Sequence, residues 1–376
     1  MTKFSIAQKS DCKRVVIKIG SALLRDNKTG KIRQKWLETV AEDIVTMRRA
    51  GQQVVLVSSG AIAMGQTALG FNTRPTRLED AQAAAAIGQI KLAHAYETLF
   101  APHETTVAQV LLTLYDLEDR ARYLNGRNTL EALLEHGTLP IVNENDTVAT
   151  QEIRFGDNDR LAARVAQLIK ADALLILSDI KGLYTADPNI DDAAELISQV
   201  TEITPKIEAM AGPAAAGTLG SGGMFTKILA AKIATAAGCS LVISNGQIDN
   251  PIRRFWESQV GTVFTASVSP LAVRKQWLRG LMAPEGYLHI DAGAEKALRK
   301  DASLLPAGVT EVDGNFSRGD LVALINENGK AIGQGLVGYT AEQAHKMKGR
   351  RSDEAQAQLG FCGRSVIVHR DDLILF

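Results

Sequence analysis

Two short clusters of carboxylate and carboxamide side chains lie close together in the middle of the chain. The run Asn143-Glu144-Asn145-Asp146 follows an apolar segment at 139–142, and the run Gly156-Asp157-Asn158-Asp159 opens an amphipathic segment. A site this acidic repels a bare phosphate and instead suits an amine or a metal-bound phosphate. Asn and Asp are also common in turns and helix caps, so a single cluster carries little information. Two clusters around one strand-to-helix step favour a binding site.

Two lysines supply the opposite charge. Lys18 stands one residue before the end of a β-branched strand, and Lys227 falls in the first turn of a helix expected at 224–237. The glycine-rich run GTLGSGGMFTK at 217–227 leads into that helix, and glycines, a helix N-terminus and a lysine together can cradle a phosphate. The run fits neither the Walker A nor the dinucleotide pattern. The alternatives are a flexible linker for the run, and for Lys18 a side chain that reaches solvent from an edge strand.

Apolar strands and helices alternate through the first two thirds of the chain. This pattern predicts an α/β fold with a doubly wound, mostly parallel sheet, in which ligands bind at the carboxyl ends of the strands. Ser58-Ser59-Gly60 and Ser178-Asp179 stand at such strand ends. We treat the Ala-rich helix at 80–99 as scaffold. The strands are expected at 15–19, 54–57, 107–112, 139–142, 173–177 and 240–244, and further helices at 36–50 and 120–136.

Composition limits the class of protein. A chain of 376 residues is long enough for two domains, and 42 basic residues balance 42 acidic ones, so bulk charge gives no indication of a nucleic-acid or membrane partner. The three cysteines form no CxxC pair, which is typical of reduced thiols. No apolar run reaches membrane-spanning length, and the N-terminus lacks the apolar core of a signal peptide. We therefore expect a cytoplasmic protein.

The pattern changes after residue 265. Short alternating strands with turn signals, among them the hairpin turn Asn328-Gly329, predict a small, mainly β domain at 285–376 after a linker at 266–284. The catalytic domain would then span 1–265. Residues 275–376 contain 13 basic and 13 acidic residues, and only the run HKMKGRR at 345–351 forms a basic patch.

The residues together indicate phosphoryl transfer, which depends mainly on positioning and charge neutralisation. Lys18 and Lys227 could neutralise the moving group from two sides, and Asp159 could hold both lysines. An α-amino group on the acceptor would suit Asp146. If the acceptor is itself a carboxylate, no strong base is needed, because the group is already ionised at neutral pH. The residues thus predict a small-molecule kinase that acts on an amino-bearing acid.

Six motifs, read in order, resemble the amino-acid kinase family: KIGSALL, VSSGAIA, INENDTVAT, FGDNDRLAA, SDIKGLYTADP and GSGGMFTK. The resemblance runs from about Val15 to Thr265 and is closest to the branch of the family that phosphorylates L-glutamate. INEND followed by GDND is its most discriminating part. The run NFSRGD at 315–320 and the closing VHRDD resemble the PUA domain that many bacterial members carry.

The resemblance implies that ATP and L-glutamate, with Mg²⁺, give ADP and L-glutamyl 5-phosphate, the first step of proline biosynthesis. It implies catalytic roles for Lys18, Lys227 and Asp159, and assigns no protein side chain to the metal. Glutamate would contact Ser59, Gly60, Asn143, Asp146 and Asn158. ATP would contact Lys18, Ser178, Asp179, Ser221, Gly222, Gly223, Met224, Phe225, Thr226 and Lys227. Ser178 replaces a threonine that is common in the family, which keeps the hydroxyl.

The same resemblance implies feedback inhibition by proline, a homo-oligomer (dimer or tetramer) and a glutamyl phosphate reductase as partner, because an acyl phosphate is labile. Two alternatives stay open. The acceptor could be that of another family branch, N-acetylglutamate or aspartate, although an acetylated substrate offers no amine to Asp146. The C-terminal domain could bind RNA, although phosphate contacts need a basic footprint that the balanced charge does not supply.

Overall fold

We describe a computed structural model of the chain. The structure describes residues 12–25, 32–149, 158–212, 223–268, 273, 284–359 and 365–376. The chain divides into two compact units, one formed by Met1–Glu118 and Asn125–Pro270 and the other by Asp119–Leu124 and Leu271–Phe376. Each unit is described by itself. The predicted linker at 266–284 falls mostly outside the described residues, so the predicted domain boundaries stay a prediction.

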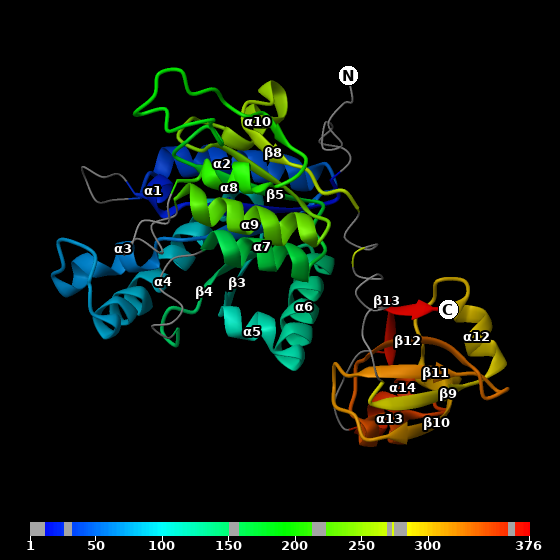
Figure 1. Ribbon diagram of the computed structural model, residues 1–376. Helices are drawn as coiled ribbons and strands as arrows, with labels where there is room; N and C mark the ends of the chain where they lie inside the picture. The colour runs from blue at the N-terminus through cyan, green and yellow to red at the C-terminus, as the bar shows by residue number, and fades with distance from the viewer. Residues whose placement is uncertain are drawn as a thin grey trace. The chain divides into compact units, whose positions relative to one another are not determined.

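An eight-stranded sheet forms the first unit (Figure 1). Its order is β3-β4-β2-β1-β5-β7-β8-β6, and of these neighbours only β7 and β8 are antiparallel. The predicted doubly wound, mostly parallel sheet is therefore confirmed. The strands are β1 (Arg14–Ile19), β2 (Gln53–Ser58), β3 (Val107–Leu112), β4 (Leu139–Glu144), β5 (Ala173–Ser178), β6 (Gln199–Val200), β7 (Ser240–Asn245) and β8 (Thr262–Phe264).

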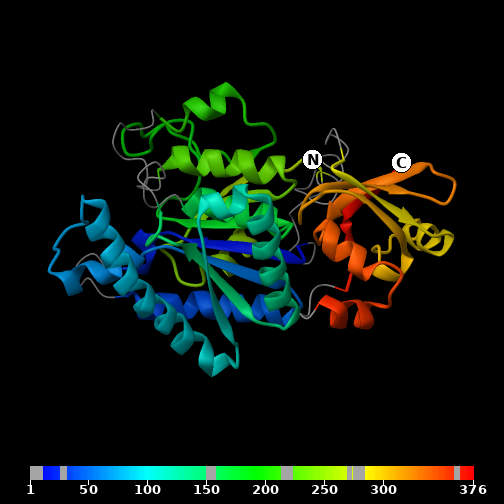
Figure 2. The ribbon, with the colours of Figure 1, turned by 90° about the horizontal axis from the view of Figure 1, so that it is seen from below.

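Helices cover both faces of this sheet, as Figure 2 shows. α7 and α9 pack on one face, whereas α2, α4 and α10 pack on the other. The α-helices of this part of the chain are α1 (Ser21–Leu24), α2 (Gln34–Arg49), α3 (Ala61–Gly65), α4 (Leu78–Phe100), α5 (Leu114–Glu118), α6 (Arg120–Glu135), α7 (Asn158–Leu168), α8 (Pro205–Ala209), α9 (Met224–Ala236) and α10 (Pro251–Ser258). Short 3₁₀ turns lie at Gln66–Leu69 and Ala101–His103.

The core of the first unit explains why the strands form where the sequence predicts them. β1, β2, β4 and β5 are buried along almost their whole length, as apolar runs covered by helices on both faces must be. β2 lies on one side of β1 and β5 on the other, so the order of the strands reverses about β1. A crevice for ligands is expected at the carboxyl end of a strand at such a reversal.

A five-stranded sheet forms the second unit, in the order β10-β9-β11-β12-β13. The predicted Asn328-Gly329 turn joins β11 to β12, and the unit has a separate apolar core. Its strands are β9 (Gly286–Ile290), β10 (Val309–Gly314), β11 (Leu321–Ile325), β12 (Ala331–Val337) and β13 (Val368–Leu375), and its helices are α12 (Ala292–Leu298), α13 (Ala341–Met347), α14 (Ser352–Leu359) and a 3₁₀ turn at Pro306–Gly308. The predicted mainly β character is confirmed, whereas β10 was not foreseen.

The described part of the chain contains no helix that is both long enough and apolar enough to cross a membrane.

Candidate active site

The carboxyl ends of four neighbouring parallel strands bring polar residues to one edge of the sheet. Lys18 is the penultimate residue of β1, and Ser58 ends β2. Asn143 and Glu144 end β4, and Ser178 ends β5. Because parallel strands share the direction of their carboxyl ends, residues up to 160 positions apart in the chain meet here.

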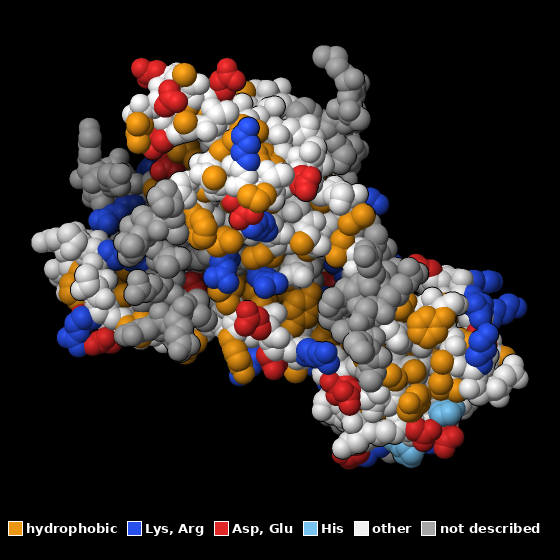
Figure 3. Space-filling model, viewed as in Figure 1, with side chains coloured by type: hydrophobic (Ala, Val, Ile, Leu, Met, Phe, Trp, Pro, Cys, Tyr) orange, Lys and Arg blue, Asp and Glu red, His pale blue; other side chains and the backbone are white. Residues whose placement is uncertain are grey.

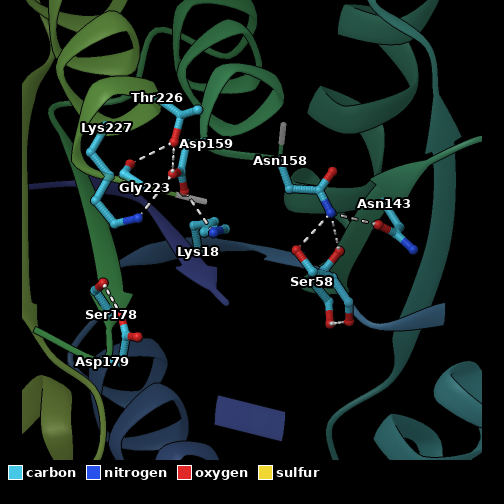
Figure 4. Close-up of polar contacts among 11 residues, drawn as sticks. Lys18, Ser58, Asn143, Asn158, Asp159, Ser178, Asp179, Gly223, Thr226 and Lys227 are labelled. Carbon is cyan, nitrogen blue, oxygen red and sulfur yellow. Dashed lines mark hydrogen bonds and ion pairs between the residues drawn. The ribbon is translucent and has the colours of Figure 1, made fainter. Parts of the chain in front are cut away.

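Lys18, Asp159 and Lys227 form a buried ion-pair cluster at this edge. The Lys18 Nζ lies 2.6 Å from Asp159 Oδ1, and the Lys227 Nζ lies 3.2 Å from Asp159 Oδ2. Figure 4 shows the three side chains converging from β1, α7 and α9. Only 6%, 1% and 3% of these residues is exposed. The sequence predicts that Lys18 and Lys227 contact the phosphoryl group and that Asp159 holds both lysines. The structure places both lysines on Asp159.

The protonation state of the cluster follows from its charges. Burial would raise the pKa of Asp159, but the two ammonium groups, that of Lys18 first, outweigh burial and hold this pKa at about 2. Burial lowers the pKa of Lys227, and the charge of Lys18 lowers it further, while Asp159 opposes both effects. Two ammonium groups around one carboxylate leave one excess positive charge. Such an excess is suited to a group that becomes more negative during reaction.

The start of α9 positions Lys227 and braces Asp159. Gly223 precedes the first turn, and the Thr226 hydroxyl lies 2.8 Å from the Gly223 carbonyl oxygen and 3.0 Å from Asp159 Oδ2. The first backbone N–H groups of a helix have no partner within it and can bind an anion. A β-carbon added to Gly223 would meet none of the described residues within 4 Å, and Gly223 lines the cavity described below.

A second polar group surrounds Asn158, at the start of α7 (Figure 4). The Asn158 Nδ2 lies 3.1 Å from the Ser58 carbonyl oxygen, 2.7 Å from Ser59 Oγ and 3.0 Å from Asn143 Oδ1. These three acceptors fix the orientation of the carboxamide. Asn158 Oδ1 is buried and accepts no hydrogen bond from the described residues. A buried acceptor without a partner is uncommon in folded proteins.

Both groups line one cavity of about 940 Å³. This volume lies near the upper end of the range for ligand pockets, so it leaves room for a nucleotide beside a small acceptor. Asp146 also lines the cavity, and burial raises its pKa to about 6, although the charge of Arg74 acts in the opposite direction. The predicted residues on its wall are Lys18, Ser59, Gly60, Asn143, Asp146, Asn158, Ser178, Asp179, Gly223, Met224 and Lys227.

Some predicted contacts fall elsewhere. Ser221 and Gly222 lie outside the described residues. Phe225 and Thr226 are not among the residues that line the cavity, and Thr226 instead contacts Asp159. Gly60 has a φ of 103°, a left-handed conformation that a residue with a β-carbon rarely adopts, which explains a glycine directly after Ser59.

Sequence reasoning missed several cavity residues. Arg74 lines the cavity and lies near enough to Asp146 to affect its pKa, yet it belongs to a polar loop without periodicity. Glu144 also lines the cavity, although the sequence marked it only as one member of an acidic run. Among the described residues, no group of three or more His, Cys, Asp or Glu side chains is arranged to hold a metal ion.

Comparison with known proteins agrees with this geometry. The profile of the amino acid kinase family matches residues 13–245, and that of the PUA domain matches residues 286–359. The chain is 53% identical over 363 residues to a glutamate 5-kinase of Paramagnetospirillum magneticum, covering 96% of this chain and 98% of that one. It is 52% identical over 370 residues to a glutamate 5-kinase of Ruegeria sp., covering 98% and 100%.

Solved structures show a more distant likeness. A carbamate kinase from Giardia lamblia bound to AMP-PNP is 19% identical, with a TM-score of 0.47, over 69% of this chain and 100% of that one. A UMP kinase from Ureaplasma parvum is 18% identical, with a TM-score of 0.46, over 67% and 98%. The family is shown by the match to the family profile and by the curated relatives, which cover nearly the whole chain. This chain belongs to the amino acid kinase family and carries a C-terminal PUA domain.

Proposed function

We propose that this protein is an ATP-dependent kinase that phosphorylates the side-chain carboxylate of L-glutamate to L-glutamyl 5-phosphate, the first step of proline biosynthesis. Relatives named glutamate 5-kinase match nearly its full length at about 52% identity. The observation that carries the proposal is that Lys18 and Lys227 converge on the buried Asp159 and line a cavity that Asn158 and Asp146 also line.

At the phosphoryl end of the site, an oxygen of the acceptor carboxylate attacks the γ-phosphorus while the bond to the bridging oxygen of ADP breaks. No proton is transferred, because the acceptor is ionised at neutral pH. Lys18 and Lys227 stabilise the negative charge on the moving group. Asp159, with a pKa of about 2, stays ionised and holds the two ammonium groups rather than acting as a base.

At the acceptor end, the cavity wall offers partners for both charges of an α-amino acid. Ionised Asp146 supplies a counter-charge for the ammonium group, and Asn158 holds the Ser59 hydroxyl on the same wall. Arg74 supplies a cation for the α-carboxylate, to which a guanidinium group can bind in a bidentate manner. Ser59, Gly60 and Asn143 complete this end of the site.

At the nucleotide end, the start of α9 and the end of β5 fit a triphosphate. Gly223, Met224 and Lys227 line the cavity, as do Ser178 at the end of β5 and Asp179, which follows it. Mg²⁺, when bound with ATP, neutralises phosphate charge. The described residues offer it no cage, which suits an ion that is held mainly by substrate phosphates and water.

The remaining expectations from the family stay predictions. They are inhibition by proline at a site that overlaps that of glutamate, assembly into a dimer or tetramer, and hand-over of the labile product to a glutamyl phosphate reductase.

The acceptor tests the proposal. Purified protein with ATP and Mg²⁺ is offered L-glutamate, N-acetyl-L-glutamate or L-aspartate, and ADP release is measured with trapping of any acyl phosphate by hydroxylamine. We expect turnover and hydroxamate with L-glutamate. Turnover should be far lower with N-acetyl-L-glutamate, which lacks an ammonium group, and with L-aspartate, which has a shorter side chain. Absence of turnover with L-glutamate would overturn the proposal.

A further inference from the structure

One face of α4 reaches the acceptor end of the site through two hydrogen bonds. Gln89 and Tyr96 stand seven residues apart on this helix, a spacing that places them on the same face. Neither residue lines the cavity, and the sequence offered α4 only as scaffold.

Gln89 orients Asn143. The Asn143 Nδ2 donates to Gln89 Oε1 over 2.7 Å, and the Asn143 Oδ1 accepts from Asn158 Nδ2 over 3.0 Å. If the Asn143 carboxamide were reversed, its oxygen would face Gln89 Oε1 and its nitrogen would face Asn158 Nδ2. In this arrangement Gln89 holds the Asn143 carboxamide with its oxygen toward Asn158.

Tyr96 supports Ser58. The Tyr96 hydroxyl lies 2.8 Å from Ser58 Oγ, and both residues are fully buried. Ser58 Oγ also lies 3.2 Å from the Ser59 carbonyl oxygen, to which it can donate. The Tyr96 O–H is then the donor to Ser58 Oγ. The carbonyl oxygen of the same Ser58 accepts from Asn158 Nδ2 over 3.1 Å, so both branches end on one atom of Asn158.

The two branches fix the orientation of the Asn158 carboxamide. Its reversal would bring its oxygen against the Ser58 carbonyl oxygen and Asn143 Oδ1, which repel it, and would break the hydrogen bond from Asn158 Nδ2 to Ser59 Oγ. We propose that Gln89 and Tyr96 are positioning residues that hold Asn158 and, through it, the Ser59 hydroxyl at the acceptor end of the cavity. This inference rests on the proposed function, in which the acceptor binds at that end.

Gln89 provides the sharper test, because its contribution is a single acceptor atom. Gln89→Met removes this atom at similar length, whereas Gln89→Glu retains it. We expect Gln89→Met to raise the KM for L-glutamate about tenfold, the equivalent of one hydrogen bond, with kcat and the KM for ATP within about twofold. Gln89→Glu should restore the KM to within about threefold of the wild-type value. Ile90→Met, at the adjacent and largely exposed position, is the matched control and should change nothing.

Two further variants separate positioning from a purely structural role. Tyr96→Phe should also raise the KM for L-glutamate without changing the KM for ATP, even after active-site titration corrects for misfolded protein. Gln89→Met in an Asn158→Ala background should add no further increase, because its effect passes through Asn158. A fall in kcat alone, an equal effect of Ile90→Met, or an additive effect in the Asn158→Ala background would overturn the inference. If wild-type protein fails to phosphorylate L-glutamate, the proposed function fails instead.

Discussion

At the scale of single residues, the site is built on a buried carboxylate between two buried ammonium groups. Removing water from three charges is costly, and the cluster is tolerated because Asp159 contacts both lysines at once. Its excess positive charge is available to a phosphoryl group. Each member is therefore expected to affect the rate of the chemical step more than the binding of the acceptor.

Replacement of Lys227 tests this assignment. Lys227→Ala should lower kcat by about 10²- to 10³-fold, as expected when a group that stabilises developing charge is lost, with the KM for L-glutamate within about threefold. Steady-state kinetics measures both constants. Lys232→Ala is the control on the same helix, because Lys232 is exposed and pairs with Glu208. An unchanged kcat for Lys227→Ala would remove its catalytic role.

Asp146 predicts a pH dependence. Burial raises its pKa to about 6, so acidification through pH 6 neutralises the counter-charge for the acceptor ammonium group. We expect kcat/KM for L-glutamate to fall as the pH falls through about 6. Asp146→Asn should raise the KM at pH 8 and abolish that acidic limb. An acidic limb that persists unchanged in Asp146→Asn would assign the titration to another group.

The pKa of Asp159 is lowered, and this shift affects the stability of the fold at acid pH. Its folded pKa of about 2 lies below the unfolded value of about 3.9, so its contribution is complete above pH 4 and is lost as the pH falls toward 2. The two carboxylates therefore act in different pH ranges, and the activity limb near pH 6 should appear without unfolding.

The residues of this cluster could be predicted because each stands at a strand or helix end with an unusual charge. Arg74, Gln89 and Tyr96 could not, because their importance depends on which loop and which helix face turn toward the cavity. An Ala-rich helix with two glutamines and one tyrosine carries no local signal of that kind.

At the scale of elements, the close crossing of α3 and α4 positions the loop that carries Ser59. Two glycines make the approach possible: a β-carbon on Gly65 would lie 1.8 Å from the Ala84 carbonyl oxygen, and one on Gly88 would lie 1.7 Å from the Ala61 carbonyl oxygen. Since α3 begins two residues after Ser59, a change in this crossing is transmitted to the acceptor end of the site.

Gly88→Ala should therefore destabilise the fold by about 1–3 kcal/mol, the usual cost of overpacking, in urea unfolding. Gly126→Ala in α6 is the matched control. Its β-carbon would meet only side-chain atoms at 3.8 Å, so the gain in helix propensity should leave stability unchanged or raise it by about 0.5–1 kcal/mol. Equal effects of the two substitutions would contradict the account of the crossing.

The sequence predicted the main strands and helices of the first unit to within about two residues, because the strands are continuous apolar runs and the helices are long and periodic. The last strand was expected at 366–369, whereas β13 extends to Leu375. The sequence did not predict β6, β8 or β10. β6 has two residues and β8 has three, which is too short for an alternating pattern. β8 also runs antiparallel to β7, whereas the alternation of strands and helices predicts parallel strands. β10 is a partly exposed strand whose apolar positions, Val309 and Val312, do not alternate.

At the scale of the whole molecule, the chain forms two units, and each has its own apolar core. The first holds every cavity residue described above, and the second matches the PUA domain, for which RNA binding was the alternative left open. The charge of the second unit does not favour that activity. Residues 275–376 carry 13 basic and 13 acidic side chains, although Lys and Arg side chains gather along one edge of this unit in Figure 3.

We therefore predict that the full chain binds tRNA no more tightly than non-specific binding, for which Kd is about 10⁻⁴–10⁻⁶ M at physiological salt. Fluorescence anisotropy over a salt series measures this. A charge-reversed Lys346→Glu, Lys348→Glu variant of the basic patch is the comparison. Tight, salt-sensitive binding that this variant loses would assign the second unit to RNA.

The most direct test of the account is a crystal structure with L-glutamate and a non-hydrolysable ATP analogue. We predict that oxygens of the γ-phosphoryl group lie within about 3.5 Å of the Lys18 and Lys227 ammonium nitrogens, with the glutamate side-chain carboxylate in line with it and the ammonium group beside Asp146. A γ-phosphoryl group bound away from both lysines, or a glutamate bound with its ammonium group remote from Asn158 and Asp146, would contradict it.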